Sequence, residues 1–188
     1  MDVALIQVPY VMGDERQGKG PQRLMQAGAA ALFAVKGVSV TEKRVDRGRP
    51  FRDSGNASLA VNKRLAPIVR QSVDAGRLPI VLAGGCDASA GVIAGFDHTQ
   101  CGVVWFDAHG DFNTPETTTT GYLPGMCLAV ITGHCYRSYC HKWGIALQLL
   151  KKQRSWRECE TWTRQRGSVS TVSRWRSMIL TTTKVTEH

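Results

Sequence analysis

Two aspartates and one histidine alternate in the middle of the chain, at Asp107, His109 and Asp111. If the backbone is extended there, alternate side chains point to the same side, so two carboxylates and an imidazole share one small space. Carboxylates that lie so close repel each other, and their pKa values rise unless a cation lies between them. The pattern therefore predicts a divalent metal site, and these ligand types suit manganese, iron, cobalt or zinc alike. The alternative interpretation is a polar loop with an exposed histidine.

A strand-like apolar run leads into these aspartates, and a second one leads into a glycine-rich turn. Residues 102–106 (GVVWF) precede Asp107, and residues 78–83 (LPIVLA) precede Gly84, Gly85 and Cys86. In an open parallel sheet, ligands bind in the crevice beyond the carboxyl ends of the strands. We therefore expect both runs to be strands and both polar clusters to lie at the same edge of the sheet.

The first 133 residues alternate strand-like and helix-like runs, in the order that builds a parallel sheet covered by helices. We predict an α/β fold with three layers, α/β/α, and a mainly parallel sheet. Further strands are expected at residues 3–8 and 38–45, and an exposed loop at 47–56. Helices are expected from Pro21 to a stop at Gly37, at 59–73 with a kink or break at Pro67, at 89–96 and at 126–132.

Most of the positive charge lies in the last part of the chain. The 188 residues have a net charge of +9; residues 1–133 carry 13 basic and 12 acidic side chains, and residues 134–188 carry 11 and 3. We therefore divide the chain into an α/β domain at 1–139 and a basic tail, rich in arginine and tryptophan, at 140–188. One hypothesis is that a shifted reading frame produced the tail, which the coding DNA would reveal. The less favoured one is an arm that binds single-stranded nucleic acid.

The remaining composition narrows the class of protein. The length suits one globular domain with a real core. No apolar run approaches the roughly 18 residues that a membrane span needs, and no signal-like segment begins the chain, so we expect a cytoplasmic protein without membrane contact. The six irregularly spaced cysteines are expected to be reduced thiols. Cys135, Cys140, His141 and Cys159 have a spacing that fits no common zinc finger.

Three stretches together resemble the arginase and agmatinase family, the ureohydrolases. They are residues 106–115 (FDAHGDFNTP) with 117–121 (TTTTG), residues 81–86 (VLAGGC) with Gly91 and Gly95, and residues 8–10 (VPY) with Gly18. The resemblance implies an arginase-like fold, two Mn²⁺ ions and a homo-oligomer. It also implies hydrolysis of a small linear guanidino or amidino compound, in which a hydroxide that bridges the two ions attacks the central carbon and urea or a related product is released.

The resemblance further implies roles for individual residues. Asp107 would bridge both metal ions, His109 would bind one of them, and Asp111 would bind the other. Asp111 would also be the catalytic residue that accepts a hydrogen bond from the attacking hydroxide. Asn113 and Thr120 would hold the amino-acid end of the substrate, and the alternative for both is plain turn chemistry. Arginine, agmatine, guanidinobutyrate and formiminoglutamate all remain candidate substrates.

The sequence departs from the family pattern at two positions near these motifs. Cys86 stands where the family usually has a metal-binding histidine, and its softer thiolate suits zinc or iron better than manganese. The site could therefore have changed its metal, lost one ion or kept only a buried thiol; a nucleophilic Cys86 with His109 as its base is a further alternative. Pro124, which carries no proton, stands where many members have a proton-shuttling histidine.

Asp111 is the last aspartate of the chain, so the second aspartate motif that completes the family's metal cluster is absent. We therefore expect a truncated or frameshifted member, with a fold that is incomplete on its C-terminal side. Weak or single-metal binding, by Mn²⁺ or by Zn²⁺, and impaired hydrolysis are expected. The competing expectation is a non-catalytic ureohydrolase-like protein that keeps a partial metal site.

Overall fold

The structure is a computed structural model that describes residues 2–48, 51, 53–96, 103–142, 159–160 and 174–175. Its main sheet has three parallel strands. Strand β1 (Val3–Val8) lies between β2 (Val40–Arg44) and β3 (Leu78–Ala83), in the order β2-β1-β3. Val3 is level with Val40 on one side and with Leu78 on the other. The nearly continuous apolar sequence of β1 suits this central place, because a central strand of a covered parallel sheet is buried on both faces.

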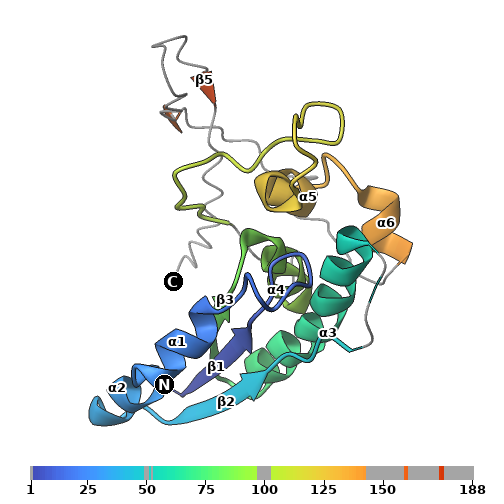
Figure 1. Ribbon diagram of the computed structural model, residues 1–188. Helices are drawn as coiled ribbons and strands as arrows, with labels where there is room; N and C mark the ends of the chain where they lie inside the picture. Colours follow the sequence, from blue (N-terminus) through green and yellow to red (C-terminus); the bar gives the residue numbers. More distant parts are fainter. Residues whose placement is uncertain are drawn as a thin grey trace, which may run out of the picture.

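Helices cover both faces of the sheet (Figure 1). The chain runs from β1 to β2 through α1 (Gly20–Gln26) and α2 (Ala29–Val35), then back across β1 to β3 through α3 (Ser54–Asp74). Because such crossovers are right-handed, this reversal of direction places the two sets of helices on opposite faces. The predicted three-layer α/β/α architecture is therefore confirmed. The chain reverses the direction in which it crosses the sheet between β1 and β3, and open α/β sheets bind ligands at such a point.

The main core lies between the sheet and α3. Ile6 and Val8 of β1 pack with Val61, Leu65 and Val69 of α3, and all five are buried. The three α3 residues recur at a spacing of four, which places them on one face of the helix. This packing holds α3 against the sheet beneath the carboxyl ends of β1 and β3.

Helix α4 (Ser89–Gly95) packs closely against α3, and two glycines permit this approach. A Cβ atom on Gly91 would lie 2.8 Å from the main-chain oxygen of Asn62, and one on Gly95 would lie 2.5 Å from the Cβ atom of Val69. Real Cβ atoms are not found at such distances. Gly91 and Gly95, which follow the VLAGGC stretch, therefore serve helix packing directly after the turn that carries Cys86.

A second core lies around helix α5 (Cys127–Ile131). Met126 and Ile131 are almost fully buried there. The other described elements are the 3₁₀ helices η1 (Cys86–Ala88) and η2 (Leu123–Met126), helix α6 (Arg137–Lys142), and the short antiparallel pair β4 (Cys159–Glu160) and β5 (Arg174–Trp175). The main-chain oxygen of Asp111 accepts hydrogen bonds from the N–H groups of Leu128 and Ala129, so α5 is tied directly to the predicted metal loop.

Two expected helices begin or end differently in the structure. The helix expected from Pro21 to Gly37 is divided into α1 and α2, because Gly28 between them adopts a left-handed conformation with φ 92°. Helix α3 begins at Ser54, within the residues expected to form a loop. Its start is set by Asp53, whose Oδ1 accepts a hydrogen bond from the N–H of Asn56 at 2.8 Å.

Of the kink or break expected at Pro67, the break does not occur, and the strand expected at 102–106 is also not seen in its described part. Pro67 lies inside α3 without ending it, since the fully buried side chains of Leu65 and Val69 hold the helix against the sheet on both sides of the proline. The strand expected at 102–106 does not form in the described part, residues 103–106. Phe106 is 93% exposed, and β3 pairs only with β1 among the described strands. A strand needs a neighbour for its N–H and C=O groups, and this run has none there.

Within the described ranges, no helix combines the length and the apolar character that crossing a bilayer requires. The four cysteines with described side chains, Cys86, Cys127, Cys135 and Cys140, are free thiols, as expected. The arginine- and tryptophan-rich residues on which the nucleic-acid hypothesis depends lie almost wholly outside the described residues, and that hypothesis stays a prediction.

Candidate metal centre

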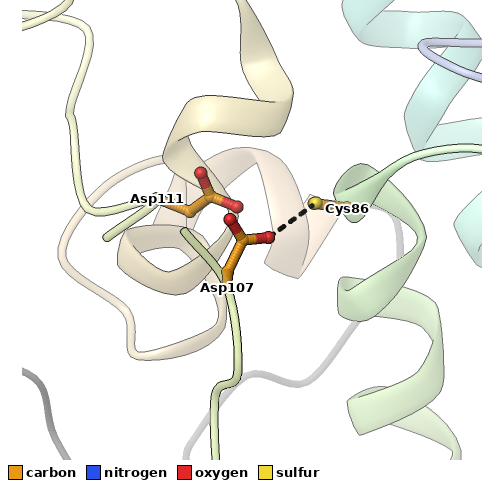
Figure 2. A group of neighbouring side chains, drawn as sticks. All are labelled: Cys86, Asp107 and Asp111. Carbon is orange, nitrogen blue, oxygen red and sulfur yellow. Dashed lines mark hydrogen bonds between the residues drawn. The ribbon is translucent and has the colours of Figure 1, made fainter. Parts of the chain in front are cut away.

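Three side chains from two separate segments converge at the carboxyl edge of the sheet (Figure 2). Cys86 is the first residue of η1, directly after β3 and the Gly84-Gly85 turn. Asp107 and Asp111 come from the loop that follows residues 103–106. Asp111 has a left-handed backbone with φ 44°, a conformation that aspartate and asparagine adopt more readily than most residues. This local turn directs the Asp111 side chain back toward Asp107.

The spacing of the three side chains suits a divalent cation. One ligand atom from each of Cys86, Asp107 and Asp111 lies within 4.8 Å of the other two, and Cys86 Sγ is 3.7 Å from Asp107 Oδ2. A tetrahedral metal with bonds of roughly 2.3 Å to sulfur and 2.0 Å to oxygen would hold these two atoms about 3.5 Å apart. Asp111 Oδ2 is buried and has no hydrogen-bond partner among the described residues. A cation would supply the partner that this oxygen lacks.

The raised pKa values of the cluster also favour a bound cation. Burial raises the pKa of Asp111, and the nearby charge of Asp107 raises it further. Burial, followed by the charge of Asp111, raises the pKa of the Cys86 thiol to about 12. The cluster therefore disfavours negative charge while it has no cation, which is expected when two carboxylates and a thiol share a partly buried space. Cys86 is protonated at neutral pH in this state, so these surroundings do not favour a nucleophilic thiolate.

His109 lies one step outside this group. Its Nδ1 is 3.2 Å from Asp107 Oδ1, and its side chain is 73% exposed. The extended backbone expected from Asp107 to Asp111 is wrong, because the chain bends at Ala108 and His109. The N–H of His109 donates to Asp107 Oδ1 at 2.8 Å, and this local hydrogen bond competes with an extended conformation. The structure therefore brings the two predicted carboxylates together with Cys86, while His109 lies outside this group of three and contacts Asp107.

A cavity of about 500 Å³ adjoins the cluster. Its walls include Cys86 and both aspartates, together with Asn113, Tyr122 and Pro124. Asn113 thus lies where a substrate could reach it, although its Oδ1 already accepts a hydrogen bond from Thr117 Oγ1 at 3.3 Å. Thr120 is not among the residues that line this cavity; its Oγ1 accepts a hydrogen bond from the N–H of Tyr122 at 3.2 Å, which is turn chemistry.

Sequence reasoning missed a buried polar network directly behind Cys86. Asp87, Ser58 and Asn62 are each at most 7% exposed and are joined by hydrogen bonds. Burial raises the pKa of Asp87. A signal was present, because Ser58 and Asn62 are polar residues four positions apart on the helix face that also carries Leu65 and Val69. Polar residues on an apolar helix face indicate buried hydrogen bonds to another segment.

The fold and the cluster place this chain among α/β/α proteins with a ligand site beyond the carboxyl ends of parallel strands. A profile of the arginase family matches residues 1–165. The arginase of Bacillus caldovelox is 31% identical over 145 residues, which are 70% of this chain and 48% of that protein. The arginase of Bacillus subtilis is 31% identical over 155 residues, 77% of this chain and 52% of that protein.

Solved structures agree with the sequence matches. The arginase of Bacillus cereus has a TM-score of 0.70 at 28% identity, covering 80% of this chain and 54% of its own. The arginase of Entamoeba histolytica, solved in complex with L-ornithine, has a TM-score of 0.62 at 29% identity, covering 71% of this chain and 50% of its own. This chain belongs to the arginase family. It spans about half the length of the relatives that it matches.

Proposed function

We propose that this chain binds one divalent cation through Cys86, Asp107 and Asp111 and uses it to hydrolyse a linear guanidino or amidino compound, with release of urea. The observation that carries the proposal is the convergence of three ligand atoms within 4.8 Å of one another, in a group that includes a buried Asp111 oxygen without a hydrogen-bond partner among the described residues. Membership of the arginase family supports the reaction class. The L-ornithine bound to the Entamoeba histolytica arginase supports a substrate with an amino-acid end.

The donor set favours a thiophilic cation. A thiolate with two carboxylates suits Zn²⁺ or Fe²⁺ better than the Mn²⁺ that the family resemblance implies. When bound, such a cation would lower the pKa of a water molecule so that hydroxide is available near neutral pH. Asp111 is the more buried of the two carboxylates and lines the cavity, which supports its proposed role of accepting a hydrogen bond from the attacking water.

The other residues of the cavity predict slow turnover. Asn113 lines the cavity and can offer its amide to the amino-acid end of a substrate. Pro124 also lines it, and a proline side chain cannot carry a proton to the leaving group. His109 is exposed beside Asp107, so its contribution to the site is to orient that carboxylate.

The direct test measures metal content and urea release together. The purified protein would be titrated with Zn²⁺, Fe²⁺ and Mn²⁺, and urea would be measured from arginine and from agmatine. Cys86→Ser should abolish tight Zn²⁺ binding, and Cys86→His should shift the preference toward Mn²⁺ and raise urea release. Cys135→Ser is the control, because Cys135 is a free thiol that lies outside the metal group. Equal Zn²⁺ affinity in the wild type and Cys86→Ser would refute the site.

A second candidate function follows from the small number of ligands. The described residues offer three ligand groups to the site, and Pro124 removes one route for proton transfer. A non-catalytic member that only binds a cation would have the same structure. Stoichiometric Zn²⁺ binding without urea from either substrate, in a protein that unfolds cooperatively, would favour this second function.

A further inference from the structure

The residue after Cys86 is held by two segments that are distant in sequence. Asp87 is 7% exposed, and its Oδ2 accepts two hydrogen bonds. One comes from the main-chain N–H of Met12 at 3.0 Å, in the loop after β1, and the other from Ser58 Oγ at 2.6 Å, in α3. The Asp87 carboxylate therefore joins η1 both to the β1 loop and to α3.

The main chain of Asp87 is attached to the same helix. Asn62 Nδ2 donates to the main-chain oxygen of Asp87 at 2.8 Å, and Asn62 Oδ1 accepts from the N–H of Gly91 at 2.7 Å. Gly91 has no room for a Cβ atom at this contact. Asn62 thus fixes the end of η1 and the start of α4 to one point on α3.

The turn before Cys86 is held through its main chain, because the N–H of Gly84 donates to the main-chain oxygen of Val8 at 2.9 Å. Gly84 and Gly85 have no side chains, and Cys86 directs its own side chain toward Asp107 (Figure 2). The position of the thiol therefore also depends on how firmly the backbone after it is held. On that side, the Asp87 carboxylate and the Asn62 amide are the side-chain groups that hold the backbone.

A contribution to stability alone does not explain Asp87. Its Oδ1 is buried and has no hydrogen-bond partner among the described residues. A buried carboxylate with an unpaired oxygen is costly, and an apolar side chain of similar size is often at least as stable at such a place. The carboxylate does supply something that an apolar residue lacks, which is a fixed link to two other segments.

We propose that Asp87 is a positioning residue of the metal site: its hydrogen bonds to Met12 and Ser58 hold the turn that places the Cys86 thiol beside the Asp107 and Asp111 carboxylates. This inference rests on the proposed metal function. Groups that hold a metal ligand in place typically change metal affinity by about 10- to 100-fold when they are removed. Asp87 itself touches neither the metal nor the substrate in this arrangement.

The test compares two serines of the same helix. Ser58→Ala removes a donor to Asp87, whereas Ser72→Ala removes an equally buried hydroxyl that donates to the main-chain oxygen of Ile68, far from the site. Co²⁺ is the probe, because ligation by Cys86 gives a thiolate-to-cobalt absorption band in the near ultraviolet. We expect Ser58→Ala to weaken Co²⁺ binding several-fold and to reduce the band at saturation, and Ser72→Ala to change neither.

Substitutions of Asp87 separate shape from hydrogen bonding. Asp87→Leu should weaken Co²⁺ binding by about 10- to 100-fold. Asp87→Asn keeps an oxygen that can accept from Met12 and Ser58, so it should restore most of the affinity and the band. Unchanged affinity and band in both Asp87→Leu and Ser58→Ala would overturn the proposal.

A metal-free measurement keeps this inference separate from the proposed function. In the presence of a chelator, the rate at which iodoacetamide modifies Cys86 can be followed by peptide mass spectrometry. Loosening of the turn should accelerate modification in Ser58→Ala and Asp87→Leu, and not in Ser72→Ala. If the wild type binds no metal, the proposed function fails; equal rates in all variants would then overturn the role of Asp87 as well.

Discussion

Replacement of Asp111 by asparagine should stabilise the metal-free protein while it removes the affinity for metal. Asp111 is 8% exposed, and its Oδ2 has no hydrogen-bond partner among the described residues. Burial, and then the charge of Asp107, raises its pKa above the usual 3.8. Asparagine suits the left-handed backbone at this position, with φ 44°, as well as aspartate does. The substitution therefore removes a charge without adding backbone strain.

The magnitude follows from the separation of the two carboxylates. Ligand atoms of Asp107 and Asp111 lie within 4.8 Å. At that distance the repulsion is about 1 kcal/mol with the dielectric constant of water and about 3.5 kcal/mol with an effective value of roughly 20. The Asp107 side chain is 26% exposed, so the lower figure is the better guide. We expect Asp111→Asn to raise the free energy of unfolding by about 1 kcal/mol and the melting temperature by about 3 °C.

This gain should depend on pH. The folded-state pKa of Asp111 is raised, so the folded protein binds the proton more tightly than the unfolded chain does. The free-energy cost of a charged Asp111 in the folded protein is absent below 3.8, the pKa of this carboxyl in the unfolded chain. The cost grows as the pH rises toward the folded-state pKa. Asp111→Asn should therefore match the wild type in strong acid and exceed it in stability at neutral pH.

Urea unfolding in a chelator and in excess Zn²⁺ is the assay. In the chelator the variant should be the more stable protein; in Zn²⁺ at 100 times the dissociation constant, the wild type should gain about 2.7 kcal/mol and overtake it. The matched control is Asp53→Asn, because hydrogen bonds to Asn56 lower the pKa of Asp53 and its loss of charge should slightly destabilise. A variant less stable than the wild type in the chelator at neutral pH would refute the reasoning.

Two other predictions concern the elements around the site. Gly95→Ala should lower the free energy of unfolding by about 2 kcal/mol, because its Cβ atom would lie 2.5 Å from the Cβ atom of Val69. Gly20→Ala is the control, because no atom lies within 4 Å of its Cβ, and it should be neutral or slightly stabilising. Thermal unfolding of both variants measures the difference. Burial, and then Arg137, lowers the pKa of His134 below 6.5, so stability should be lost as the pH falls through that value. Between pH 7.5 and 5.5, His134→Gln should lose less free energy of unfolding than the wild type does. An equal loss in both proteins would contradict this prediction.

The elements that sequence predicted best are those in which one residue type repeats at a regular interval. The apolar runs of β1 and β3 and the four-residue spacing of Val61, Leu65 and Val69 are local patterns that also determine which face is buried. The run at 103–106 has the same local pattern and does not form a strand. Strand formation depends on a neighbouring strand as well as on composition, and no local pattern reveals whether that neighbour is present.

The sequence was sufficient to predict that the candidate ligand residues lie close together, but it did not predict the detailed geometry. The residue types at Asp107 and Asp111 were sufficient to predict that two carboxylates meet, and Cys86 was placed correctly because it follows a parallel strand. The side chain of His109 was expected to share the same side, but the hydrogen bond between its N–H and Asp107 bends the backbone. The hydrogen bonds from Met12 and Ser58 to Asp87 were missed because these three residues are far apart in sequence and meet only after α3 has packed on the sheet.

The thiol of Cys86 provides a physical basis for metal selection. Its pKa is raised to about 12, so a cation that binds its sulfur must first displace a proton. A cation that forms strong bonds to sulfur, such as Zn²⁺, offsets that cost, whereas Mn²⁺ does not and would rely on Asp107 and Asp111 alone. Anchoring of the Cys86 turn by Asp87 therefore matters more for a thiophilic metal than for manganese. Cys86, where the family resemblance implies a histidine, and the buried carboxylate of Asp87 would then act together to determine which ion the proposed site holds.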